Sequence, residues 1–316
     1  MRCDIHVDSS ISQRRILPTI SVDWFLLDAH RMDYVTPKDT IIEAGQLASR
    51  KAALSTAQML LRGALAGGIL AYATSLAMIV NAQGLPPIVA AICFPVGFVI
   101  LVLLGLELAT GNFALLPIGW LSGDVRASQV LRNWTWVYTG NLLGSVAYAV
   151  LFYLAITGFG TSNGAALGDQ LRKAAQAKTL AYQALGLAGW GTAFVKAMLC
   201  NWMVTLGAVL ALMSRSTIGK VTAMWLPITT FFAHGYEHSI VNMFVVPAGR
   251  LLGAPVPLST WWLWNQIPVT LGNLFAGVIF TGAALYAAYP QPRETQPHEA
   301  PIAEVGFVPS AGVEPV

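Results

Sequence analysis

Two short polar runs interrupt apolar stretches of the chain and carry side chains that could do chemistry. The first run is Glu-Leu-Ala-Thr-Gly-Asn at 107–112, and the second is His-Gly-Tyr-Glu-His-Ser-Ile-Val-Asn at 234–242. Together they hold carboxylates, imidazoles, hydroxyls and carboxamides. An imidazole with an unperturbed pKa of about 6.5 can carry a proton near neutral pH. Such groups could move protons, bind a small ion or hold a metal.

The metal reading depends on residues 234–238, which match the H-x-x-E-H pattern of inverted zinc proteases. That site needs a third protein ligand and an unbroken helix. Gly235 and the surrounding polar residues favour a break instead. The acidic residues that follow His238 all lie in the C-terminal tail: Glu294, Glu299, Glu304 and Glu314. We therefore expect that the protein has no metal site and no catalytic residues and is not an enzyme. An intramembrane zinc protease stays the remote alternative.

The composition indicates that lipid surrounds most of the chain. Charged residues make up 10% of the 316 positions and hydrophobic residues 55%, whereas about 25% of a soluble domain is charged. The widely spaced Cys3, Cys93 and Cys200 predict neither a disulfide framework nor a metal cluster. The net charge of +3 comes from scattered basic residues, so no nucleic-acid partner is expected.

Six membrane spans are expected, because a helix needs about 20 apolar residues to cross the hydrocarbon core. Suitable stretches start near Thr56, Leu85, Val130, Leu185, Val221 and Asn265. The two polar runs fall inside the second and fifth spans. Non-helical backbone at that depth must be buried in protein or line a cavity. We therefore predict an all-α fold in which each of these two spans is a pair of half-helices.

Similar residues recur at nearly the same separation in the two halves of the chain, 130 to 134 positions apart. The pairs are Arg62 with Lys196, Asn112 with Asn242, and Gly-Asn-Leu at 140–142 with the same triplet at 272–274. Because three spans separate the copies, the halves insert with opposite orientation. This predicts a 3+3 inverted repeat whose breaks meet near the midplane.

Four regions follow from these patterns. They are a polar N-terminal segment (1–36), a short amphipathic helix on the membrane surface (37–55, with Ile41, Ile42, Leu47 and Ala48 on its apolar face), a transmembrane domain (56–289) and a disordered Pro- and Glu-rich tail (290–316). Lys and Arg residues outside the spans are concentrated on the side that holds both termini. Both termini are therefore predicted to be cytoplasmic, in the inner cell membrane.

Ionisable residues at membrane depth mark a pathway by default, because burying each costs at least about 2.5–3.5 kcal/mol. For Glu107 and Glu237 a structural alternative stays open, in which they accept hydrogen bonds from freed backbone N–H groups with Arg62 and Lys196 as counter-charges. For His238 a pathway role is favoured over that of a buried structural histidine.

The half-helix N-termini would direct backbone donors and positive dipole ends at a central cavity, which suits an anion. Lys178, on the polar segment between the third and fourth spans, could attract anions at the outer mouth, or it could be a solvated surface lysine.

With these features, residues 36–289 resemble the formate/nitrite transporter family. The matching elements are Leu-Ala-Thr-Gly-Asn at 108–112, Gly-Asn-Leu-Leu-Gly-Ser at 140–145, Leu-Cys-Asn-Trp-Met-Val at 199–204, Gly-Tyr-Glu-His-Ser-Ile-Val-Asn-Met-Phe at 235–244 followed by Pro247 and Gly249, and Ile-Pro-Val-Thr-Leu-Gly-Asn at 267–273.

The resemblance implies an aquaporin-like protomer in a homopentamer, with one pore per subunit and no cofactor. The implied pore residues are Thr110, His238, Asn201 and Lys178, with Glu237, Asn242 and Asn112 in the breaks. The implied constrictions comprise Leu108, Val204 and Phe231 on one side and Phe94 and Phe98 on the other. Formate or nitrite is the implied substrate, with hydrosulfide or another short monocarboxylate as the alternative. Because a bare anion pays a large desolvation cost in a dry constriction, we expect a proton from His238 or from water to accompany it. Simple channel conduction past a charged imidazolium is the alternative mechanism.

Two positions depart from the family pattern. Many members have phenylalanine where this chain has Ala109, which changes the width of the inner constriction. His234 stands where a small residue is common and adds a titratable group.

Overall fold

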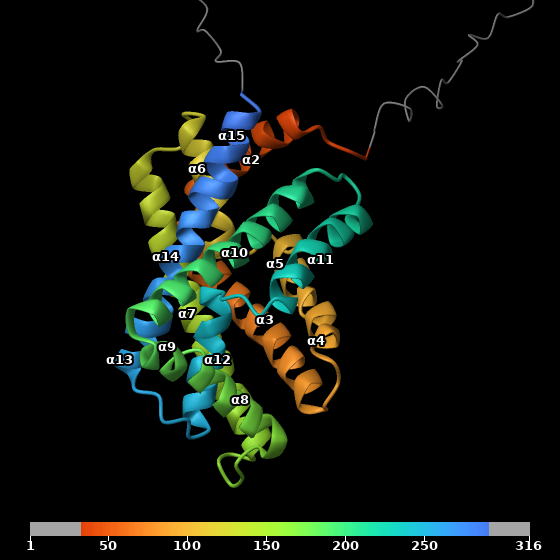
Figure 1. The fold of residues 1–316 in the computed structure, drawn as a ribbon. Coiled ribbons are helices and arrows are strands. Elements are labelled where there is room, and N and C mark those ends of the chain that lie inside the picture. Colours follow the sequence, from red (N-terminus) through yellow and green to blue (C-terminus); the bar gives the residue numbers. More distant parts are fainter. Residues whose placement is uncertain (1–32, 291–316) are drawn as a thin grey trace, which may run out of the picture. The chain divides into compact units, whose positions relative to one another are not determined.

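The computed structural model describes residues 33–290, and this part of the chain is helical. Figure 1 shows the arrangement. The elements are α2 (Pro37–Ala52), α3 (Thr56–Ala82), α4 (Pro87–Cys93), α5 (Pro95–Leu103), α6 (Ala109–Leu121), α7 (Ala127–Thr157), α8 (Ala165–Ala177), α9 (Leu180–Ala184), α10 (Gly186–Leu212), α11 (Thr217–Ala233), α12 (Ser239–Leu251), α13 (Leu258–Trp261), the π-helical η1 (Trp262–Gln266), α14 (Ile267–Phe275), the π-helical η2 (Ala276–Ala283) and α15 (Ala284–Ala288). The expected N-terminal segment and C-terminal tail lie largely outside the described residues.

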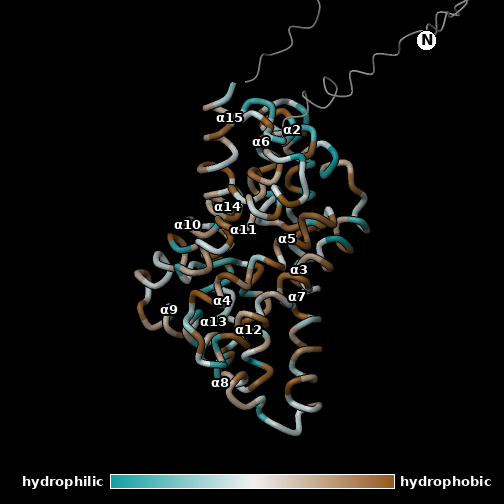
Figure 2. Tube along the Cα trace, turned by 90° about the vertical axis from the view of Figure 1, so that its right-hand side faces the viewer, coloured by the Kyte–Doolittle hydropathy of each residue, from teal (hydrophilic) through white to brown (hydrophobic). Residues whose placement is uncertain are grey.

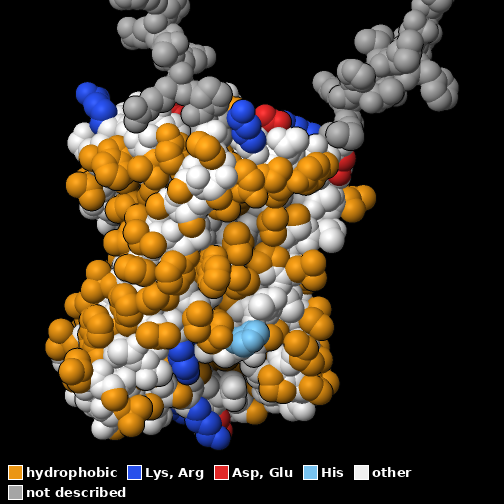
Figure 3. Space-filling model, turned by 45° about the horizontal axis from the view of Figure 1, so that its top comes forward, with side chains coloured by type: hydrophobic (Ala, Val, Ile, Leu, Met, Phe, Trp, Pro, Cys, Tyr) orange, Lys and Arg blue, Asp and Glu red, His pale blue; other side chains and the backbone are white. Residues whose placement is uncertain are grey.

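Four helical stretches among residues 33–290 are long and apolar enough to cross a bilayer. They are Thr56–Ala82, Ala127–Thr157, Leu187–Leu212 and Leu258–Ala288. Hydrophobic residues recur along the full length of the helical trace (Figure 2) and cover the middle of the face shown in Figure 3, where charged side chains lie toward the two ends. The all-helical membrane fold agrees with the prediction, and four of the six expected spans are continuous.

The other two expected spans are interrupted where the sequence places its polar runs. The helix α5 ends at Leu103 and α6 begins at Ala109, whereas α11 ends at Ala233 and α12 begins at Ser239. Each break turns at a glycine with positive φ, +64° at Gly105 and +65° at Gly235, a conformation that residues with a Cβ rarely adopt. The half-helices are 17 residues or shorter, so none of them alone spans the hydrocarbon core.

Glycines also set how closely the long helices approach each other. A Cβ at Gly140 of α7 would lie 2.6 Å from the carbonyl oxygen of Leu60 on α3, and a Cβ at Gly272 of α14 would lie 2.3 Å from that of Phe194 on α10. Only glycine permits backbones this close. The Gly-Asn-Leu triplets therefore mark equivalent contacts between helices.

The helix α2 packs against the end of α6. Its N-cap Thr36 accepts a hydrogen bond from the Asp39 amide, and its buried face includes Ile41 and Ala48. Ile42, which the sequence places on the apolar face, is 41% exposed. Figure 1 shows α2 and α15 at the same end of the helical array, with α8 at the other end.

Candidate functional site

The carboxylate of Glu107 is buried at the first break and is held by side chains. Lys51 of α2 places Nζ 2.8 Å from Glu107 Oε1. Asn112, in the first turns of α6, donates from Nδ2 to Glu107 Oε2 at 2.7 Å. The side chain of Glu107 is 2% exposed, so Lys51 compensates a charge that could not otherwise remain buried.

The second break repeats this arrangement around Glu237. Lys178 Nζ lies 2.8 Å from Glu237 Oε2, and Asn242 Nδ2 donates to the same oxygen at 2.9 Å. The Tyr182 hydroxyl donates to Glu237 Oε1 at 2.9 Å. Burial, followed by the neighbouring carboxylate, raises the pKa of Tyr182 well above its usual value, so this phenol keeps its proton and remains a donor.

Asn141 of α7 fastens the first break to its neighbours. Its Nδ2 donates to the carbonyl oxygens of Gly63 at 2.8 Å and Glu107 at 2.9 Å, and its Oδ1 accepts from the Ala109 amide at 2.9 Å. One buried carboxamide thus satisfies the backbone groups on either side of Leu108, where the non-helical segment leads into α6, and ties this segment to α3. This removes the penalty for unpaired backbone groups at membrane depth.

Asn273 of α14 does the same at the second break. It donates to the carbonyl oxygens of Ala197 at 2.8 Å and Glu237 at 3.1 Å, and it accepts from the Ser239 amide at 2.9 Å. The sequence identifies Asn141 and Asn273 only as markers of a repeat. A carboxamide at one position in two apolar helices is the signal for this role, because a buried amide requires partners.

The predicted counter-charges for the two glutamates are wrong. The ammonium groups that pair with Glu107 and Glu237 belong to the lysines of α2 and of the α8–α9 junction. Arg62 lines a pocket beside the first break. The Nζ of Lys196 lies 5.9 Å from the centre of the Tyr182 ring. The glutamates also accept from lysine, asparagine and tyrosine side chains rather than from freed backbone N–H groups.

His238 and Thr110 meet between the two breaks. His238 Nε2 lies 3.0 Å from Thr110 Oγ1, and both residues are buried. His238 is the N-cap of α12, and its Nδ1 accepts from the Val241 amide at 3.2 Å. Since Nδ1 is the acceptor, Nε2 carries the proton of the neutral ring and donates a hydrogen bond to the Thr110 hydroxyl oxygen. The Thr110 hydroxyl hydrogen then remains available to another acceptor.

Several buried polar atoms near this contact have no partner among the described residues. Asn201 Nδ2 donates to the carbonyl oxygens of Thr110 at 3.1 Å and Asn273 at 2.6 Å. Its Oδ1 has no partner, nor do Ser239 Oγ and Asn242 Oδ1. Buried polar atoms without protein partners are typical of sites that water or a ligand fills.

An aromatic side chain packs against His238 and belongs to a large buried hydrophobic cluster. The ring centre of Phe231 lies 5.8 Å from the ring centre of His238 and 5.7 Å from the ring centre of Phe94. The remaining residues expected at constrictions are buried in the same hydrophobic cluster, namely Phe98, Leu108 and Val204. These predicted side chains therefore belong to one buried cluster, of which Phe231 lies against His238.

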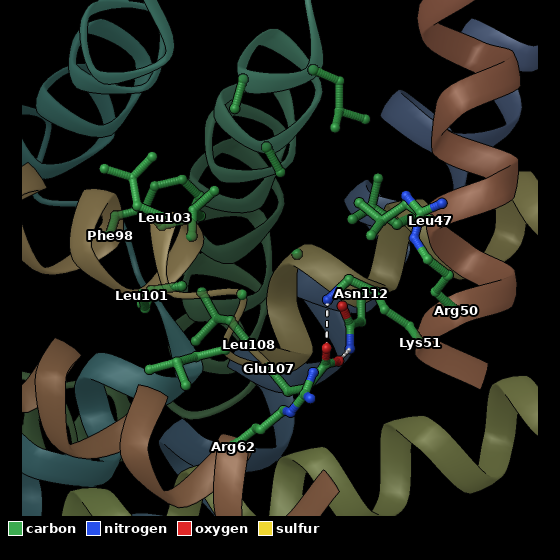
Figure 4. A pocket seen from close by; sticks show the side chains of 18 of the residues that line it. Leu47, Arg50, Lys51, Arg62, Phe98, Leu101, Leu103, Glu107, Leu108 and Asn112 are labelled. Carbon is green, nitrogen blue, oxygen red and sulfur yellow. Dashed lines mark hydrogen bonds and ion pairs between the residues drawn. The ribbon is translucent and has the colours of Figure 1, made fainter. Parts of the chain in front are cut away.

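A pocket of about 390 Å³ opens beside the first break (Figure 4). We name it the α2-side pocket. Its apolar lining includes Phe98 and Leu108, and Glu107 is its acidic residue. Its basic lining residues are Arg50, Lys51, Arg62 and Lys220.

His234 and His238 do not face a common site. His234 is exposed at the end of α11, where its ring stacks on Tyr236 with centres 5.0 Å apart, whereas His238 is buried at the start of α12. The helix that the zinc motif requires is broken between them. No group of three or more His, Cys, Asp or Glu side chains within residues 33–290 is placed to hold a metal.

These features define a multi-pass α-helical membrane transport protein: apolar helices surround two buried helix breaks that meet at one polar contact. The chain belongs to the formate/nitrite transporter family, whose model matches residues 38–287. The resemblance seen in the sequence is confirmed. Membership in a family of transporters places the chain among transport proteins rather than enzymes.

Comparisons with individual proteins agree with this family membership. The chain is 34% identical over 272 residues to a probable formate transporter of Methanothermobacter thermautotrophicus, covering 81% of this chain and 97% of the relative. It is similar to the solved structure of an FNT family ion channel, with 28% identity, a TM-score of 0.69 and coverage of 80% and 99%. A pentameric formate channel with formate bound matches with 27% identity, a TM-score of 0.61 and coverage of 75% and 98%.

Proposed function

We propose that this protein conducts small monovalent anions across the membrane, with formate or nitrite as the first candidates. The observation that carries the proposal is the contact of His238 with Thr110, which places polar hydrogens in the buried interior, beside the ring of Phe231. The formate bound by a similar channel supports the substrate class. Hydrosulfide and other short monocarboxylates are the alternative substrates.

The proposed architecture is six spans in a 3+3 inverted repeat. Its support is the matched chemistry of the breaks, in each of which a lysine and an asparagine bind the glutamate carboxylate and a second asparagine binds the glutamate carbonyl oxygen. The helices α6 and α12 both begin beside the His238–Thr110 contact. Both would present the positive ends of their dipoles to an anion there. We extend the proposal to a homopentamer, as in the similar pentameric formate channel.

The proposed chemistry begins with the neutral form of His238. A bare anion at this buried contact would lose its hydration, which is costly without compensating hydrogen bonds. The Nε2–H group of His238 and the Thr110 hydroxyl donate hydrogen bonds to the anion. A proton taken from the aqueous solution at the mouth of the pore neutralises the anion before it crosses. Delivery of the proton by His238 is the competing version. It requires an imidazolium whose Nδ1–H would face the Val241 amide, so two donors would oppose each other and the cap would have to open.

The decisive experiment is uptake of labelled formate and nitrite into proteoliposomes, with and without a pH gradient. We expect uptake above that of protein-free liposomes, and stimulation when the outside is acidic. Thr110→Val should reduce uptake because it removes the buried hydroxyl, whereas Thr135→Val is the matched control, since Thr135 is exposed on α7. Equal uptake by protein-free and protein-containing liposomes would contradict the proposal.

The proposed orientation places both termini in the cytoplasm and Lys178 on the outer side. A membrane-impermeant thiol reagent applied to intact cells should label a cysteine at position 178 and miss one at position 220. Labelling at position 220 alone would reverse the orientation.

A further inference from the structure

The α2-side pocket carries more positive charge than its own acidic residue can balance. Lys51 pairs with Glu107, the acidic residue of the lining. Arg50, Arg62 and Lys220 also line the pocket, and within residues 33–290 none of these three makes an ion pair or a side-chain hydrogen bond. They come from three helices, α2, α3 and α11, so the charge is assembled by the fold and is not a local run.

The size and walls of the pocket suit a ligand larger than a monovalent anion of a few atoms. Its volume of about 390 Å³ lies in the range of small-molecule sites. Gly111 also lines it, and outside its own turn of helix no heavy atom lies within 4 Å of the position that a Cβ would take there. Most of the other walls are leucines, which keep the effective dielectric low and strengthen the attraction between cation and anion.

We propose that the α2-side pocket binds a soluble multivalent oxyanion of the phosphate or polycarboxylate class, and that this ligand slows transport from the α2 side. Two arginines supply planar donor forks that match oxyanion geometry, and Lys220 supplies a third charge. A monovalent anion would leave two of these three charges uncompensated.

The position of the pocket explains why such a ligand obstructs instead of permeating. Phe98 and Leu108 line it and also belong to the apolar cluster whose member Phe231 packs against His238. A multivalent anion that entered this cluster would lose its hydration without the basic residues that hold it in the pocket. This regulation rests on the proposed anion transport, whereas binding to the pocket does not.

The test is labelled formate uptake into phosphatidylcholine liposomes that contain randomly oriented protein. Pyrophosphate or citrate is added outside only, or on both sides, at constant ionic strength. Outside addition should inhibit only the molecules whose α2 side faces outward, and addition on both sides should inhibit nearly all uptake. Relative to each variant's own uninhibited rate, Arg50→Gln/Lys220→Gln should need at least about tenfold more pyrophosphate for half inhibition. Arg126→Gln, which removes an exposed arginine outside the pocket, should match the wild type.

The other possible outcomes would contradict either the pocket as the binding site, the proposed transport or the soluble ligand. Equal inhibition of all variants, or complete inhibition from one side, would overturn the pocket as the site. Absence of formate uptake without inhibitor would overturn the proposed transport instead. Calorimetric titration of the detergent-solubilised protein with pyrophosphate would then still test binding against the double variant. A further arm adds phosphatidylglycerol to the liposomes and omits pyrophosphate. If this lipid slows uptake by the wild type but not by the double variant, the pocket binds a lipid headgroup and the proposal of a soluble ligand is overturned.

Discussion

Replacing Lys178 with methionine separates two roles for this residue. The sequence suggests an anion attractor at the outer mouth, whereas the structure pairs Lys178 with Glu237 at 2.8 Å. The side chain of Glu237 is 4% exposed and that of Lys178 is 19% exposed. Lys178→Met leaves the carboxylate with Tyr182 and Asn242 as donors but without a counter-charge. Removing one partner of a buried ion pair costs about 3–5 kcal/mol.

The reverse change should cost less. In Glu237→Gln the ammonium of Lys178 is left alone, but it is partly exposed and can reach water through its flexible stem. The lost hydrogen bonds then cost about 1–3 kcal/mol. The double variant Lys178→Met/Glu237→Gln should be close to Glu237→Gln alone, because no unpaired charge remains. Lys51→Met and Glu107→Gln form the matched pair at the other break and should show the same order.

The assay is the apparent melting temperature of the detergent-solubilised protein, measured beside formate uptake per folded protein. With a shift of about 2–4 °C per kcal/mol, Lys178→Met should lower the melting temperature by about 6–20 °C. If Lys178→Met instead lowers uptake at an unchanged melting temperature, Lys178 acts as a free anion attractor and the ion-pair reasoning is refuted.

Three further results are expected. His238→Asn should slow formate uptake but keep its stimulation by an inward proton gradient, because water supplies the proton; loss of that stimulation would assign proton delivery to the imidazole, and curves that superimpose on the wild type would make His238 a packing residue. Ala109→Phe should slow uptake of acetate more than that of formate, because the added ring narrows the constriction; an equal effect on both anions would separate Ala109 from selectivity. Native mass spectrometry of the solubilised protein should give a pentamer, and an active monomer would contradict the proposed assembly without affecting the pore.

The sequence was sufficient to locate the two helix breaks. Their polar residues stand out against apolar surroundings, and hydropathy together with glycine reports such a contrast directly. The recurrence of Asn112 at Asn242 also pointed to equivalent positions. Both asparagines do occupy the same place, each donating to the glutamate five residues before it.

The partners of the glutamates could not be predicted in the same way. Lys51 lies 56 positions from Glu107 and Lys178 lies 59 positions from Glu237. Such pairs depend on how α2 and the α8–α9 junction fold back over the breaks, which local patterns do not encode. Arg62 and Lys196 lie in the spans themselves and were the nearer choice by sequence, yet neither forms an ion pair in the described part of the chain.

The N-caps of α6 and α12 have nearly the same backbone conformation although their side chains differ completely. Leu108 has φ −113° and ψ 118°, and His238 has φ −117° and ψ 120°. The scaffold therefore does not dictate which residue occupies either position. If the two halves descend from one duplicated unit, a single side-chain exchange was enough to give one copy an imidazole and the other a hydrocarbon. To reverse the polar contact in an engineered protein, the exchange Leu108→His/His238→Leu would have to be combined with Thr110→Ile/Ile240→Thr, because Ile240 stands where the second half repeats Thr110.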